Sequence, residues 1–208
     1  QTYAENCELI VFESGCSERS ESFFEDKPDV TLVHDARPYL TVGHKRNVLM
    51  QRARGDVLCM FDDDNVYSPR YVEAMLLHLL SSGAEATTLD GFFGISLDTD
   101  TWESYRNVGG RGETLLFFAK KQQASFDEEV TWGEEKKMID LVRPNGIHRV
   151  WDDVGLFIHV DHGKNFTSVR PATHEERKGQ WYSADAGVEW RPARREEISC
   201  EPALDILD

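Results

Sequence analysis

The feature that most constrains the fold of this chain is a run of three aspartates directly after a short apolar segment. Residues 57–61 (VLCMF) predict a buried central strand, which leads straight into Asp62, Asp63 and Asp64. Adjacent carboxylates repel one another unless a cation neutralises them. Ligands of open α/β sheets bind at the carboxyl ends of the strands, and oxygen ligands suit Mg²⁺ or Mn²⁺. The run therefore predicts either a divalent metal site or a solvated acidic turn that caps the next helix.

Segments of alternating type lie on both sides of this strand. Apolar runs at residues 7–12 and 30–33 predict two further strands, and the pattern of residues 42–53 predicts an amphipathic helix. Ser68 and Pro69 are typical of a helix start, and apolar residues then follow helical spacing over residues 72–80. Strands and helices that alternate at this pace favour a layered α/β fold with a mostly parallel central sheet.

The second half of the chain has weaker patterns. It predicts one helix and three strands, over residues 132–142, 91–95, 114–119 and 155–160. After residue 165 the composition turns polar and shows little periodicity. We therefore expect a domain over residues 1–168 and a polar extension or tail over residues 169–208.

The balance of charge limits the choice of partners. The chain carries 23 Lys and Arg against 38 Asp and Glu, a formal net charge of -15. Such an acidic chain repels polyphosphate backbones, so we expect no nucleic acid partner. A divalent cation would still allow a nucleoside diphosphate to bind. No stretch approaches the ~20 apolar residues of a membrane span, so membrane association is not visible in the sequence.

Cysteine usage bears weakly on localisation. The four cysteines form neither a CxxC pair nor a dense framework, and no signal peptide is visible. This usage favours a reducing compartment such as the cytoplasm. Because the chain begins at Gln1 without an initiator methionine, the localisation stays otherwise unassigned.

Four motifs in one order resemble glycosyltransferase family 2. They are a helix with an Arg-Asn pair, an A-x-G-D turn, an apolar strand that ends in a DxD-type motif, and a helix that begins near proline. They lie at residues 43–47, 53–56, 61–65 and 68–69. The resemblance covers about residues 1–168 and implies a GT-A (Rossmann-like) fold of three layers, α/β/α. Residues 1–11 resemble that family's second strand, so about 30 residues of a first strand and helix are expected upstream.

The resemblance also implies roles for residues on the donor side. Asp64 matches the carboxylate that joins a divalent ion, Mn²⁺ or Mg²⁺, to the donor's diphosphate, with Asp62 and Asp63 near the ribose or the water shell of the metal. Lys45 and Arg46 could face the phosphates, or be ordinary solvated helix charges. The remaining residues implied for nucleotide-sugar binding are Glu13, Ser14 and Asn47.

A second acidic motif resembles the family's G-E-D sequence, whose last acid is a general base. Here Gly133 precedes Glu134 and Glu135, so Glu135 takes the place of the base that removes the acceptor's hydroxyl proton. Attack opposite the leaving nucleotide would invert the anomeric centre. The alternative is that two glutamates at a helix start complement the helix dipole. Trp132, next to the motif, is the aromatic residue expected to contact the acceptor.

A third motif contains two histidines near the end of the apolar strand at residues 155–160. It resembles the H-x-x-H-G-x-N segment of a branch of the family, which implies that His162 and then His159 help to hold the metal. The alternative is that one histidine is packed and the other caps the turn.

Together these motifs predict a metal-dependent, inverting glycosyltransferase of the hexosyltransferase type. The expected partners are a nucleoside-diphosphate sugar, most simply a UDP-sugar, and a glycan or other hydroxyl acceptor. Two alternatives stay open, a non-catalytic relative that binds a nucleotide or sugar, and a sugar-nucleotide nucleotidyltransferase.

Overall fold

The computed structural model describes residues 1–3, 5–15, 20–119, 125–130, 133–142, 146–163 and 189–199. The helices are α1 (Glu21–Phe24), α2 (Val42–Arg52), α3 (Tyr71–Ser82) and α4 (Glu135–Val142), with 3₁₀ turns η1 (Gly112–Thr114) and η4 (Arg195–Glu197). The strands are β1 (Leu9–Ser14), β2 (Val30–Asp35), β3 (Val57–Cys59), β4 (Val66–Tyr67), β5 (Ala86–Ser96), β6 (Thr101–Arg106), β7 (Leu116–Phe118), β8 (Ile147–Trp151), β9 (Phe157–Asp161) and β10 (Glu189–Pro192).

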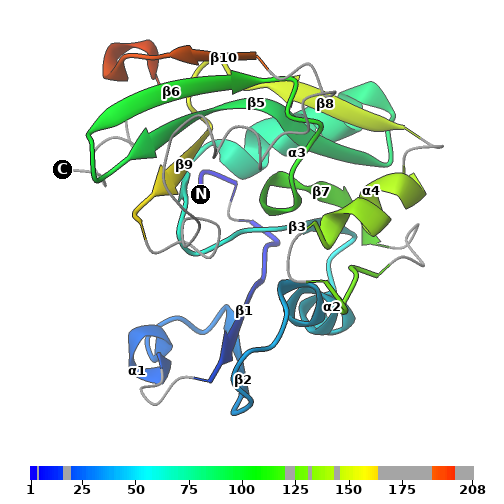
Figure 1. The fold of residues 1–208 in the computed structure, drawn as a ribbon. Coiled ribbons are helices and arrows are strands. Elements are labelled where there is room, and N and C mark those ends of the chain that lie inside the picture. The colour runs from blue at the N-terminus through cyan, green and yellow to red at the C-terminus, as the bar shows by residue number, and fades with distance from the viewer. Residues whose placement is uncertain are drawn as a thin grey trace.

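The described strands form two sheets (Figure 1). β1 and β2 pair in parallel as a sheet of their own. In the larger sheet, the long strand β5 pairs antiparallel with β6 and β7 and parallel with β8 and β9, while β3 pairs antiparallel with β7. The α/β fold class is therefore confirmed, but the larger sheet is mixed rather than mostly parallel.

The connection between β5 and β6 gives one reason for the mixed pairing. Only residues 97–100 separate the two strands, and so short a loop permits an antiparallel hairpin but no parallel crossover. Asp100, in the loop, has a positive φ of 50°. The pattern of the first half of the chain, with a helix between most strands, does not extend to this part, and β6 and β8 were not predicted.

Helix α3 packs on β5 and anchors the core. Tyr71, Met75 and Leu79 are fully buried, and they contact Leu89 and Phe92 of β5 in one cluster. The helix ends as predicted, with Gly83 in the left-handed conformation at φ 68°.

The start of α3 differs from the expectation. The helix begins at Tyr71 rather than at Ser68-Pro69, because Ser68 closes the turn that precedes it. The Ser68 hydroxyl accepts a hydrogen bond from the backbone N–H of Arg70 at 3.2 Å, and the Ser68 carbonyl accepts one from Tyr71 at 2.9 Å.

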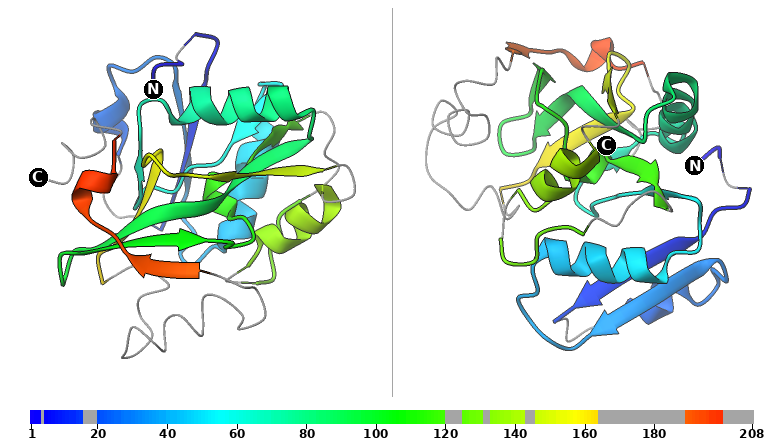
Figure 2. Two further views of the ribbon diagram at one scale, coloured as in Figure 1. Left: turned by 90° about the horizontal axis from the view of Figure 1, so that it is seen from above. Right: turned by 90° about the vertical axis from the view of Figure 1, so that its right-hand side faces the viewer.

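The N-terminal strands lie apart from the larger sheet, with α2 beside them (Figures 1 and 2). The strands predicted over residues 7–12 and 30–33 are confirmed as β1 and β2, each with its end shifted by two residues. Thr41 caps α2, since its hydroxyl accepts a hydrogen bond from the backbone N–H of His44 at 3.2 Å.

The described part of the predicted C-terminal extension belongs to the sheet. β10 pairs antiparallel with β6, and Ile198 is 4% exposed in a cluster with Phe93 and Ile158. Residues 189–199 are thus packed against the domain rather than forming a loose tail. Within the described ranges, no helix has both the length and the apolar character that crossing a bilayer requires.

Candidate functional site

The aspartate run lies in the turn between β3 and β4, and hydrogen bonds close this turn. The backbone N–H of Asp62 donates to the hydroxyl of Tyr67 at 3.1 Å, and that hydroxyl donates to the carbonyl of Glu113 at 2.9 Å. The Tyr67 hydroxyl therefore links the start of the aspartate run to the turn η1 through hydrogen bonds. Asp63 is exposed to solvent, while Asp62 and Asp64 are half-buried.

Asp64 and His162 lie side by side although nearly a hundred residues separate them. β4 pairs antiparallel with β9, which brings the aspartate turn alongside the end of β9. Asp64 Oδ2 lies 3.9 Å from His162 Nε2, and the two side chains are 37% and 33% exposed. This arrangement leaves both groups open to solvent. Among the residues that the structure describes, no group of three or more metal-ligating side chains converges.

His159 has a different environment from His162. Its Nδ1 lies 2.9 Å from Asn65 Oδ1, which also accepts a hydrogen bond from the backbone N–H of Val160 at 3.2 Å. Burial, aided by the nearby charge of Arg111, lowers the pKa of His159 to about 4. The imidazole is therefore neutral at physiological pH and tied to Asn65.

Arg46 lies between two carboxylates from distant parts of the chain. Its Nη2 donates to Asp62 Oδ1 at 2.8 Å and its Nη1 donates to Glu134 Oε1 at 2.6 Å. Burial by itself lowers the pKa of Arg46, but the carboxylates of Asp62, Glu134 and Glu113 raise it above its ordinary value. The sequence left two alternatives for this side chain, donor phosphates or solvent, and in the structure it is 5% exposed and lies against protein carboxylates.

Asn47, the other half of the Arg-Asn pair, holds the loop that precedes α4. Its amide nitrogen donates to the Phe126 carbonyl at 3.0 Å and to Glu128 Oε1 at 2.7 Å, and its oxygen accepts from the Phe126 N–H at 2.8 Å. In this structure Asn47 is therefore a buried scaffold residue. Lys45, which lies between His44 and Arg46 in the sequence, is half-buried.

The two glutamates of the predicted base motif have different surroundings. Glu134 is 6% exposed and bound by Arg46, while Glu135 begins α4 and is half-buried. Burial raises the pKa of Glu135, and the negative charges of Glu134 and Glu113 add to the shift. A carboxylate with a raised pKa is a stronger base near neutral pH. Trp132 lies outside the described residues.

The turn η1 is part of the site, and its role was not predicted. Glu113 is 8% exposed and forms an ion pair with Arg111. Burial would raise the pKa of Glu113, but Arg111, backbone hydrogen bonding and Arg46 lower it below its ordinary value. The sequence signal was weak, since these residues stand next to a polar, glycine-rich stretch without periodicity.

Glu13 and Ser14 lie at the carboxyl end of β1. Glu13 Oε1 accepts hydrogen bonds from the backbone N–H and the hydroxyl of Ser20 at 3.2 and 2.9 Å. Its Oε2 lies 3.6 Å from His34 Nδ1, and Ser14 is paired with Asp35 of β2. The two residues implied for base and ribose binding thus border a polar group of side chains at this strand end.

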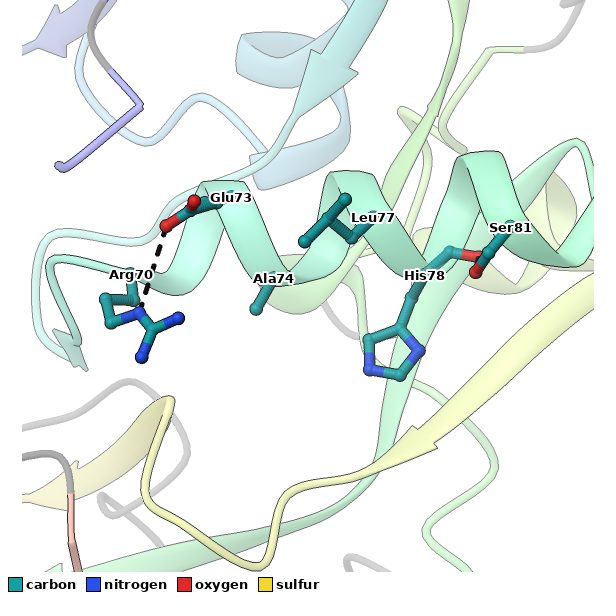
Figure 3. Close-up of a pocket in the computed structure, with 6 residues that line it drawn as sticks. All are labelled: Arg70, Glu73, Ala74, Leu77, His78 and Ser81. Carbon is teal, nitrogen blue, oxygen red and sulfur yellow. Dashed lines mark hydrogen bonds and ion pairs between the residues drawn. The ribbon is translucent and has the colours of Figure 1, made fainter.

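A shallow depression of about 240 Å³ lies along α3 (Figure 3). The side chains that line it are Arg70, Glu73, Ala74, Leu77, His78 and Ser81. None of the carboxylates described above borders it, so it does not belong to the candidate site.

Comparison with known proteins identifies the family and a similar fold. A family model described as Glycosyl transferase family 2 matches residues 1–140. Among solved structures, S. aureus TarS in complex with UDP-GlcNAc is similar with a TM-score of 0.61 and 14% identity, over 83% of this chain and 54% of that one. TarS in complex with UDP has a TM-score of 0.57 and 14% identity, over 84% and 60%. A search of curated proteins gives no match.

The chain spans about half the length of these solved structures. At this level of identity the likeness shows a shared fold, and it supports the GT-A type of α/β architecture.

Proposed function

This chain belongs to glycosyl transferase family 2, and from that premise we propose that it transfers a sugar from a nucleoside diphosphate to a hydroxyl acceptor. The observation that carries the proposal is that one arginine brings the two acidic motifs together. Arg46 binds both Asp62 and Glu134, so the aspartate run and the candidate base Glu135 belong to one site. A transferase needs its donor and its base within reach of one reacting carbon.

On the donor side, we infer a UDP-sugar. The similar TarS structures are complexes with UDP-GlcNAc and UDP. Asp62 and Asp63 would orient the ribose and diphosphate, and Glu13 and Ser14 would contact the base and ribose. A hexose or N-acetylhexosamine is the sugar class that this likeness favours.

The Asp64–His162 pair has the chemistry to hold Mn²⁺ or Mg²⁺. It offers one carboxylate oxygen and one imidazole nitrogen, both open to solvent, and a neutral imidazole suits Mn²⁺ better than Mg²⁺. His159 contacts Asn65 through Nδ1, and a part for its Nε2 in the ligand set stays a prediction. When bound, the ion supplies Lewis-acid stabilisation of the diphosphate leaving group. Asp64 and His162 would keep the phosphates on this side of the site.

On the acceptor side, Glu135 would act as the general base. Its carboxylate would accept the proton of the acceptor hydroxyl as the oxygen attacks the anomeric carbon. The new glycosidic bond forms as the bond to the nucleoside diphosphate breaks, so one displacement inverts the anomeric centre. The raised pKa of Glu135 supports this role. Trp132 would provide an apolar face for the acceptor sugar.

A turnover assay tests the proposal. Release of UDP is measured over a panel of UDP-hexoses and UDP-N-acetylhexosamines with a glycan acceptor, with Mn²⁺, with Mg²⁺ and after chelation. We expect turnover that depends on the metal and is lost in Asp64→Asn, with an inverted product by NMR. The matched control is Asp153→Asn, a surface carboxylate 63% exposed.

Two results would overturn parts of the proposal. Undiminished turnover after exhaustive chelation would refute the role of the metal. Binding of UDP with Mn²⁺ but no release of UDP from any donor would indicate a non-catalytic relative instead.

A further inference from the structure

Arg46 joins two carboxylates that belong to separate segments of the chain. It comes from α2 and is 5% exposed, and its guanidinium donates hydrogen bonds to residues outside that helix. Its two Nη atoms donate to carboxylates on different elements, Asp62 after β3 and Glu134 before α4. The guanidinium is planar, and its fixed fork sets the distance and angle between two groups that it binds together.

Neighbouring residues pack closely around the Arg46 guanidinium. The guanidinium carbon lies 5.3 Å from the centre of the Phe126 ring. On another side is Gly112, where a Cβ atom would overlap Arg46 Nη1 and lie 3.0 Å from Glu135 Cβ. The absence of a side chain at residue 112 is what lets η1 approach both the arginine and the candidate base.

A second connection joins the same parts of the molecule through η1. The carbonyl of Glu113 accepts the Tyr67 hydroxyl, which accepts the backbone N–H of Asp62. The turn that packs against Glu135 is therefore also hydrogen-bonded to the first residue of the aspartate run. The donor side and the base side of the site share one scaffold.

We propose that Arg46 is a positioning residue that couples the donor side of the site to the candidate base, by holding Asp62 and Glu134 in one fixed geometry. The inference rests on the proposed function, because it assigns Arg46 to the arrangement of that same site rather than to the donor phosphates. Lysine could not replace it, since an ammonium group is a point charge without the planar fork.

The charges around Glu135 give the proposal a readout that packing alone would not change. Glu135 is near the charges of Glu134, the residue before it, of Glu113 from η1 and of Arg46 from α2. Removal of the Arg46 charge would make deprotonation of Glu135 harder, which moves the acidic limb of the kcat profile to higher pH. Removal of the Glu134 charge would make it easier and move the limb to lower pH.

The experiment compares Arg46→Lys, Arg46→Gln and Glu134→Gln with the exposed control Arg52→Gln on the same helix. Kinetic constants and pH profiles are measured on protein shown to be folded. We expect kcat to fall about 10²-fold in Arg46→Lys, the size of effect that a misplacement of about 1 Å produces, with less change in the KM for the donor. Arg46→Gln and Glu134→Gln should shift the acidic limb in opposite directions. A large rise in KM at constant kcat, or unmoved limbs, would overturn the proposal.

A second measurement separates failure of this inference from failure of the proposed function. If the wild-type protein turns over no donor, the proposed function is wrong, and the coupling is tested by denaturation instead. The costs of Asp62→Asn and Glu134→Gln should be non-additive with Arg46 present and additive in an Arg46→Met background. Additive costs in both backgrounds would refute the coupling itself.

Discussion

Two carboxylates of the same aspartate run have different partners, although their side chains are about equally exposed, 35% for Asp62 and 37% for Asp64. Asp62 belongs to an inner cluster with Arg46 and Glu134, in which the arginine and glutamate side chains are 7% and 8% exposed and the contacts are 2.8 and 2.6 Å. Asp64 belongs to an outer pair with His162, in which the two side chains are 37% and 33% exposed and lie 3.9 Å apart. The inner cluster contains a permanent cation, the guanidinium of Arg46. The outer pair has only a histidine, which is a cation only when protonated.

This difference indicates which carboxylate has a cation within the protein and which one is left to solvent or to a bound metal ion. The two carboxylates of the inner cluster share the guanidinium of Arg46, so these contacts contribute to the architecture at any metal concentration. The outer pair holds a carboxylate whose repulsion with its neighbours is relieved by solvent, or by a bound ion. The same run of three aspartates thus serves both as scaffold and as candidate ligand.

Substitution of Glu135, which borders the inner cluster, should give the largest loss of activity. Glu135→Gln keeps the shape of the side chain and removes the base, so we expect kcat to fall about 10²–10⁴-fold with the fold intact. The matched control is Asp140→Asn, on the exposed side of the same helix. A kcat within threefold of wild type would show that Glu135 is only a helix-start carboxylate.

Arg46→Met should give the largest loss of stability. It leaves the carboxylates of Asp62 and Glu134 without their cation, which costs about 3–5 kcal/mol of the free energy of unfolding. The control is Arg54→Met, whose side chain is 84% exposed and pairs with Glu8, for about 0–1 kcal/mol. Urea denaturation measures both, and equal costs would remove the distinction between the inner cluster and an ordinary surface pair.

Asp64→Asn should change stability by less than about 0.5 kcal/mol in metal-free buffer, because the side chain is partly exposed and its repulsion is relieved. With Mn²⁺ and UDP present, however, the wild type should gain thermal stability and the variant should not. Scanning calorimetry with and without the two ligands tests this. A metal-free loss as large as that of Arg46→Met would place Asp64 in the scaffold.

A histidine pair outside the site should have the smallest effect, a weak dependence of stability on pH. His78 Nδ1 lies 3.3 Å from His148 Nε2, and burial, with the charge of His148, lowers the pKa of His78 below its ordinary value of 6.5. The unfolded chain therefore binds a proton more readily below about pH 6.5. Stability should rise slightly as pH increases towards 6.5 and stay level above it. His78→Gln should flatten this slope, and a slope unchanged in the variant would assign it to other groups.

Much of the first half of the chain was predictable because its signals are local. The strand that ends in the aspartate run, the stripe of α3 and its glycine end all follow from spacing within a few residues. The family resemblance rests on the same segment, and the family model confirms it. β6 and β8 were missed because they are partly polar, so the period-two pattern of a half-buried strand is faint.

The candidate site was only partly predictable. The sequence named Asp62, Asp64, Glu135 and His162, and the structure brings Asp64 to His162. It did not indicate Glu113, since no pattern distinguishes a carboxylate that a turn buries against an arginine from one that faces water. The role of Trp132 stays a prediction.

The sequence by itself determined the kind of chain this is, the family to which it belongs and the strand end at which acidic side chains gather. Only the tertiary structure decided which of those side chains meet. Arg46 and Glu134 are 88 residues apart in the chain, and their contact depends on how α2, α4 and η1 pack together. Local spacing sets the secondary structure, but the partner of a buried charge is whichever opposite charge the folded chain brings within reach of it.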